Sequence, residues 1–124
     1  MNDVTAVLLI AHGSRRAEAN DDLVRLAEVI REKHVYQIIQ TAYLELAEPT
    51  IDAAGEKCVA AGASRVKLLP YFLSAGAHVT EDLERHRREL ANRFPHVVFE
   101  LCPPLGLHPL MVEIVMERLR QAGE

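Results

Sequence analysis

Cysteine is scarce in this chain, which has two among its 124 residues. Cys58 and Cys102 are too few and too far apart for a disulfide framework or a paired-cysteine zinc site. Ile51, Ala54, Cys58 and Ala61 recur at the spacing of one helical face, which indicates a buried side chain at Cys58. We therefore expect small buried thiols that have no catalytic role.

Excess positive charge and long apolar runs are also lacking. The chain has 14 Lys and Arg against 18 Asp and Glu, a net charge of −4, and 5% aromatic residues. Without a basic patch, neither nucleic acid nor an anionic membrane is an expected partner. The apolar opening VTAVLLIAH is too short to cross a membrane and has no signal-peptide cleavage pattern. We expect a cytoplasmic protein.

The chain does contain a regular alternation of strand-like and helix-like segments. Strands are predicted at Val4–Ala11, Val35–Leu44, Arg65–Leu73 and Val97–Cys102. Helices are predicted between them, the second beginning at Glu48-Pro49, and a last one runs from Pro109 to about Arg120. Short connections and the absence of a linker predict one α/β domain over residues 1–124. It should be a flavodoxin-like sandwich, a four-stranded parallel sheet with helices on both faces.

The final predicted helix is apolar over more than the single stripe that a surface helix needs. Its apolar residues are Leu110, Met111, Val112, Ile114, Val115, Met116 and Leu119. Two interpretations stay open: a deeply packed terminal helix, or a surface at which two subunits meet.

Three side chains suited to holding a divalent metal each follow a predicted strand. They are His12, Glu45 and His78, and each lies 33 residues from the next. Because the carboxyl ends of parallel strands meet at one edge of a sheet, the three can converge there. Imidazole and carboxylate ligands together favour a first-row transition metal over Mg²⁺ or Ca²⁺.

His12 lies in the loop AHGSR, where Gly13 allows a tight backbone path and Ser14 and Arg15 could face a ligand. A lone histidine in such a loop is more often structural. HGSR also resembles the phosphatases that use a histidine in an Arg-His-Gly motif, but these enzymes need the preceding arginine to clamp phosphate. Ala11 cannot do so, which makes a histidine phosphatase the most remote alternative.

The other two candidate ligands also have ordinary alternatives. In YLELAEPT, Glu48 suits a helix-start acid stabilised by the helix dipole, whereas Glu45 lies closer to the strand end. His78 ends the turn SAGAH, where the dipole disfavours imidazolium but favours the neutral imidazole that binds metals. The remaining histidines are expected to be structural or surface residues: His34, His86, His96 and His108.

Taken in order, the segments AHGSR, YLELAEPTI, LLPYFLSAGAHVTEDL and PPLG closely resemble the small CbiX-type sirohydrochlorin chelatases. These class II enzymes insert a metal into a tetrapyrrole without ATP. The resemblance implies that His12 and His78 bind the metal, that His12 accepts a proton, and that Glu45 contacts metal or substrate. Besides Ser14, Arg15 and Glu45, the residues implied to contact the macrocycle are Leu73, Ser74, Ala75, Gly76 and Ala77.

The resemblance also bears on partners. Larger relatives contain two such domains, so it implies that a single-domain chain pairs as a homodimer. The divalent metal is the substrate, and no other cofactor is expected. Co²⁺ for cobalamin synthesis is the first choice by resemblance, with Fe²⁺ for sirohaem and Ni²⁺ as alternatives, because imidazole sites do not discriminate sharply among them. A metal or tetrapyrrole carrier could use the same residues without turnover.

Overall fold

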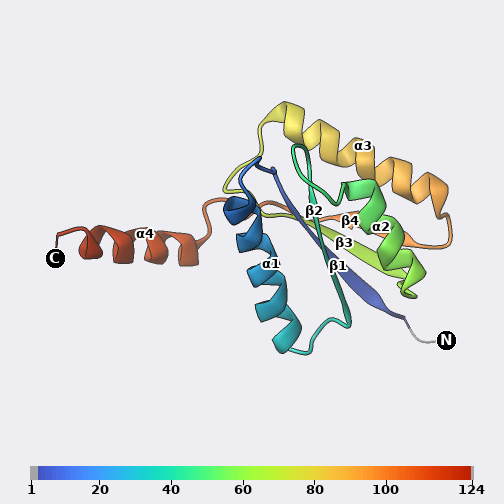
Figure 1. The fold of residues 1–124 in the computed structure, drawn as a ribbon, viewed down its shortest axis with the longest axis horizontal. Coiled ribbons are helices and arrows are strands. Elements are labelled where there is room, and N and C mark those ends of the chain that lie inside the picture. Colours follow the sequence, from blue (N-terminus) through green and yellow to red (C-terminus); the bar gives the residue numbers. More distant parts are fainter. Residues whose placement is uncertain (1–2, 124) are drawn as a thin grey trace.

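The computed structural model describes residues 3–123, in which four parallel strands alternate with four helices (Figure 1). The elements are β1 (Thr5–Ala11), α1 (Ala17–Glu32), β2 (Ile38–Tyr43), α2 (Ile51–Ala60), β3 (Arg65–Pro70), α3 (Ala77–Arg93), β4 (Val98–Leu101) and α4 (Pro109–Gln121). The strand order is β2-β1-β3-β4. The predicted α/β fold and its parallel sheet are therefore confirmed. Met1, Asn2 and Glu124, which the predicted domain included, lie outside the described residues.

The central strand β1 is buried on both faces, which explains why its sequence is a continuous apolar run. Ala6, Leu8 and Ile10 belong to the hydrophobic core beneath α2 and α3. Val7 and Leu9 belong to a second core beneath α1. Figure 1 shows α1 on one side of the strands and α2 and α3 on the other. Helices on both faces of the sheet were expected, and three of the four helices are placed in this way.

Helices α2 and α3 approach closely where a glycine faces a leucine. A Cβ atom added to Gly55 would lie 2.8 Å from both Cδ atoms of Leu90, which is closer than ordinary packing allows. Leu90 is fully buried and contacts the core that the two helices share. Gly55 thus sets the short separation between these helices.

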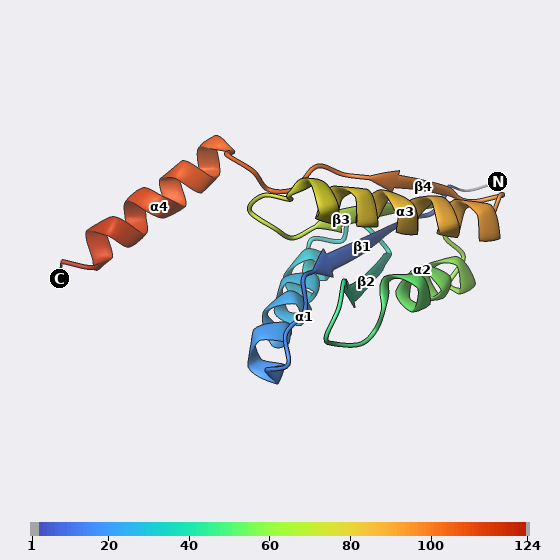
Figure 2. The same cartoon turned by 90° about the horizontal axis from the view of Figure 1, so that it is seen from above.

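Helix α4 is different, because it projects away from the sheet (Figure 2). None of its residues is buried, although seven of its side chains are large and apolar. The deeply packed terminal helix, one of the two predicted interpretations, is therefore wrong. Among residues 3–123, no helix is long and apolar enough to span a membrane.

The second and third strands are shorter than predicted. Strand β2 starts at Ile38 rather than Val35, because α1 ends through His34 at φ +57° and leaves Val35 71% exposed. Strand β3 ends at Pro70 rather than Leu73. Beyond it, the carbonyl of Leu73 accepts a hydrogen bond from the N–H of Gly106 instead of pairing within a strand.

The second helix begins later than predicted, and β4 is shorter than Val97–Cys102. Pro49 precedes α2 instead of opening it, and the Glu48–Pro49 peptide is cis. Thr50 is the N-cap, because its hydroxyl accepts a hydrogen bond from the N–H of Ala53 at 3.2 Å. The helix starts where this cap satisfies an N–H group that has no partner within the helix.

Replacing Leu90 with alanine should lower the free energy of unfolding by about 2–5 kcal/mol, because it leaves a cavity between α2 and α3. Urea denaturation would measure the change. The exposed Val35→Ala is the matched control and should change it by less than about 0.5 kcal/mol. Equal effects of the two substitutions would contradict the described packing.

Candidate functional site

His12 and Glu45 meet at the carboxyl edge of the sheet, as their spacing predicted. The pairing of β1 with β2 continues past the strand ends, where the N–H of Glu45 donates to the carbonyl of His12 at 3.0 Å. Their side chains also meet, with Nε2 of His12 lying 2.8 Å from Oε1 of Glu45. Both side chains are 57% exposed. An imidazole and a carboxylate are therefore held together where a ligand can reach them.

Gly13 makes this close approach of the two loops feasible. Its φ of +103° lies in the region that favours glycine. A Cβ at this position would lie 1.7 Å from the carbonyl oxygen of Glu45, which is a severe overlap. A tight backbone path was predicted at Gly13. In the structure the Glu45 backbone also packs directly against this residue.

Asn20 and Tyr43 fix the rest of the loop, and sequence reasoning missed both. The N–H of Ser14 donates to Oδ1 of Asn20 at 3.0 Å, and Nδ2 of Asn20 donates to the Ser14 carbonyl at 2.8 Å. The Tyr43 hydroxyl donates to the Asn20 carbonyl at 2.8 Å. Burial, and the nearby charge of Asp21, raise the pKa of Tyr43, so it stays a donor at neutral pH. No local sequence motif signals this linkage, because its partners lie on different elements.

The other residues expected in this loop lie at its surface. Arg15 is exposed, and the hydroxyl of Ser14 accepts a hydrogen bond from the N–H of Arg16 at 3.1 Å. The Arg15 side chain is therefore open to solvent, where a ligand can reach it.

His78 is exposed in the first turn of α3, whose N-cap is Gly76. Its nearest donor atom does not lie within 4.8 Å of those of both His12 and Glu45, so the three side chains as placed do not surround one ion. Among residues 3–123, the donor atoms that meet this limit belong to Asp52, His86 and Glu89. The structure thus brings together two of the three predicted ligands and leaves His78 apart from them.

Phe72, which directly precedes the predicted macrocycle-contacting segment Leu73–Ala77, lies beside His12. The rings of His12 and Phe72 are tilted at 60° with centroids 6.3 Å apart. The carbonyl of Phe72 accepts a hydrogen bond from the N–H of Leu105 at 3.0 Å, so the segment after β4 holds it from one side. Sequence reasoning missed Phe72 as a neighbour of His12, because the contact joins two loops.

An apolar groove of about 450 Å³ lies between the residues that follow β3 and the start of α4. Its lining is formed by Leu73, Ser74, Gly106, Leu107, Met111, Val112 and Val115. Leu73 and Ser74 were predicted to contact a macrocycle, whereas Ala75, Gly76 and Ala77 lie outside the lining. The groove offers a flat hydrophobic molecule a surface next to the residues that follow β3.

Neither cysteine contributes to this chemistry. Burial raises the pKa of the Cys58 thiol to about 11, and burial also raises that of Cys102. Both are protonated at neutral pH, whereas metal binding requires the thiolate. The predicted buried thiol at Cys58 is confirmed, whereas Cys102 is only partly buried.

Comparison with known proteins identifies similar chains. The family model described as CbiX matches residues 6–122. The chloroplastic sirohydrochlorin ferrochelatase of Arabidopsis thaliana is 35% identical over 120 residues, which cover 97% of this chain and 53% of the relative. The sirohydrochlorin cobaltochelatase of Priestia megaterium is 32% identical over 120 residues, covering 97% and 39%.

The fold is also similar to a solved structure. SirB from Bacillus subtilis with Fe³⁺ superposes with a TM-score of 0.88 at 29% sequence identity, over 98% of this chain and 48% of SirB. The chain spans about half the length of these curated relatives.

Replacing Gly13 with alanine should lower the free energy of unfolding by at least about 1 kcal/mol more than Gly62→Ala does. Gly62 is the matched control, because its φ of +104° imposes the same backbone strain but nothing lies within 4 Å of an added Cβ. The difference, measured by urea denaturation, isolates the overlap with Glu45. Equal losses would show that the two loops do not pack as described.

Proposed function

Since this chain belongs to the CbiX family, we propose that it is a sirohydrochlorin chelatase, which inserts a divalent metal into the tetrapyrrole without ATP. The observation that carries this proposal is the His12–Glu45 pair at an open sheet edge, beside the Phe72–Leu73 segment. Such a site provides a metal ligand, a proton acceptor and an apolar surface together. The names of the similar proteins support sirohydrochlorin as the substrate.

Metal insertion needs a base, because two pyrrole N–H protons must leave as one divalent ion enters. His12 is placed for this role. When its neutral ring donates from Nε2 to Glu45, the lone pair of Nδ1 is free to bind the metal or take a proton. Proton uptake then creates an imidazolium that the adjacent carboxylate stabilises. Glu45 orients His12 and can accept the second proton.

We assign the second metal contact to His78. It is exposed in the first turn of α3, where a metal can reach its imidazole. Its donor atom is not within 4.8 Å of those of both His12 and Glu45. The three side chains must therefore rotate toward an ion in order to bind it together. The exposed positions of all three leave room for such rotation.

The substrate has an apolar ring and carboxylate side chains, and the site offers a partner for each. The groove lined by Leu73 and Ser74 receives the ring. Ala75, Gly76 and Ala77 follow these residues in the chain and would contact the edge of the macrocycle. The exposed Arg15, next to Ser14 in the chain, can pair with a substrate carboxylate. The proposed metal is Co²⁺, with Fe²⁺ and Ni²⁺ as alternatives, because the ligand types do not separate them.

His12→Ala and His78→Ala should each lower kcat/KM for Co²⁺ insertion into sirohydrochlorin by at least about a hundredfold. Each substitution removes a metal contact, and His12→Ala also removes the base. Absorbance of the tetrapyrrole would follow the reaction. His96→Ala is the matched control, since His96 is exposed and distant in the chain from the proposed ligands. Near wild-type activity of folded His78→Ala would reject its role, and binding without multiple turnover would indicate a carrier.

We further propose that the chain pairs as a homodimer through α4. This helix exposes an apolar face that includes Leu110, Val115 and Leu119, and large exposed apolar patches commonly mark interaction surfaces. The groove residues on α4 would then lie next to the partner.

A charge within this face should separate the subunits. Val115→Asp is expected to convert a dimer to a monomer in sedimentation equilibrium at micromolar concentration, because the carboxylate would be buried without a partner. Glu113→Gln, about half a turn away around the helix, is the control and should leave the dimer intact. A wild-type monomer, or an unchanged Val115→Asp dimer, would reject this interface.

A further inference from the structure

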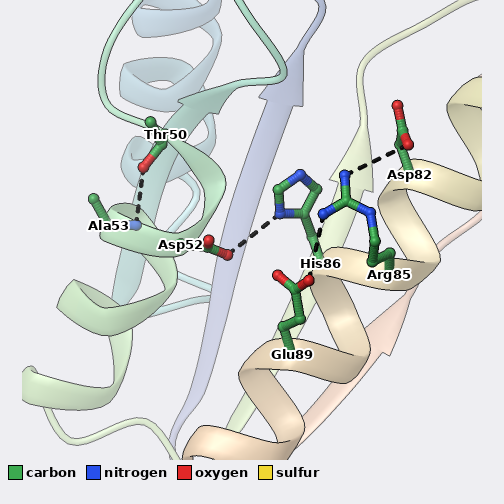
Figure 3. A network of polar contacts seen from close by, with 7 residues as sticks. All are labelled: Thr50, Asp52, Ala53, Asp82, Arg85, His86 and Glu89. Carbon is green, nitrogen blue, oxygen red and sulfur yellow. Dashed lines mark hydrogen bonds and ion pairs between the residues drawn. The ribbon is translucent and has the colours of Figure 1, made fainter.

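A second group of metal-ligand side chains lies between α2 and α3. Asp52 projects from the first turn of α2 toward His86 of α3, with Glu89 beside it (Figure 3). One donor atom from each of the three lies within 4.8 Å of the others. We propose that Asp52, His86 and Glu89 bind a first-row divalent cation at a site that shares no residue with the His12–Glu45 pair.

The two helices hold the three side chains in place before any ion arrives. His86 and Glu89 are three residues apart on α3, so they project from the same side of the helix. The Thr50 cap fixes the turn that carries Asp52. The close packing of Gly55 against Leu90 sets the distance between the helices. An ion would therefore find a framework that needs only side-chain adjustment.

The contacts present without metal also suit replacement by an ion. Nδ1 of His86 lies 3.3 Å from Oδ1 of Asp52, and the His86 side chain is only 18% exposed. A neutral imidazole with two carboxylates balances the charge of a divalent cation. An ion bound between His86 and Asp52 would replace the hydrogen bond that joins them.

Arg85 is the main competitor for Glu89. Its guanidinium lies 3.3 Å from Oε1 of Glu89 and 3.5 Å from Oδ1 of Asp82 (Figure 3). When Glu89 turns to an ion, Arg85 keeps Asp82 as a partner. Both contacts are half exposed, so exchanging one of them costs little.

The donor set selects the class of ion. One nitrogen and two carboxylates suit Zn²⁺, Co²⁺, Mn²⁺ or Fe²⁺, whereas Mg²⁺ and Ca²⁺ prefer oxygen ligands alone. Three protein ligands leave a position for water, and the partly exposed carboxylates of Asp52 and Glu89 leave it accessible. An ion here would join the start of α2 to the middle of α3, so binding should stabilise the fold.

The test uses Co²⁺ and the full chain carrying His12→Ala and His78→Ala, which removes the proposed substrate-metal ligands. Calorimetry should show one Co²⁺ bound per chain, with a rise in Tm. Adding Glu89→Gln should weaken the affinity at least about tenfold, because loss of even an indirect metal contact has an effect of that size. Adding Glu81→Gln, the same change at an exposed position of α3, should leave the affinity unchanged.

His86→Ala in the same background should abolish the Co²⁺ signal. If that protein fails to fold, the exposed Glu89→Gln variant decides the matter. No Co²⁺ binding in the double variant, or equal affinities for Glu89→Gln and Glu81→Gln, would overturn the proposal. Because no chelatase activity is measured, this result is independent of the proposed function.

Discussion

The parallel pairing of β1 with its two neighbours is the constraint on which the rest of the structure depends. β1 is central, pairs with β2 and β3, and is buried on both faces. Its backbone hydrogen bonds have no alternative partners in the core, so the register is strongly specified. The same pairing continues beyond the strands into the loops, where it brings Glu45 beside His12. The candidate site is thus an extension of the sheet.

This origin explains why the site is both precise and open. Backbone hydrogen bonds position the two loops, and Gly13 allows them to touch, while the side chains of His12 and Glu45 remain half exposed. A rigid backbone with exposed side chains can accept a large flat substrate without being rebuilt. His78 belongs to a helix start rather than to this backbone pairing, which is why it stands apart from the other two.

The two faces of the sheet have different roles. α1 covers one core, and α2 and α3 cover the other while also bringing Asp52, His86 and Glu89 together. α4 covers neither, and its apolar side chains face outward. A domain with such a helix buries less apolar surface than its sequence could provide. In the homodimer that we propose, a second copy of the domain would cover this apolar surface.

The sequence by itself determined the alternation of strands and helices, the parallel sheet and the convergence of His12 with Glu45. These features follow from local periodicity and from the rule that parallel strands present their carboxyl ends at one edge. The boundaries at Val35, Pro49 and Leu73 were wrong. The positive φ of His34 delays the start of β2, and the Thr50 cap sets the start of α2. The hydrogen bond from Gly106 takes Leu73 out of β3.

Only the tertiary structure decided how Asn20 and Tyr43 hold the site, that α4 stands clear of the sheet, and that His86 meets Asp52. Each depends on residues from separate elements, whose distance no local pattern encodes. His86 has the sequence context of an ordinary helix-surface residue, and it acquires its neighbours only because Gly55 lets α2 and α3 pack closely. Periodicity specifies which face of an element is buried, whereas packing specifies what that face meets.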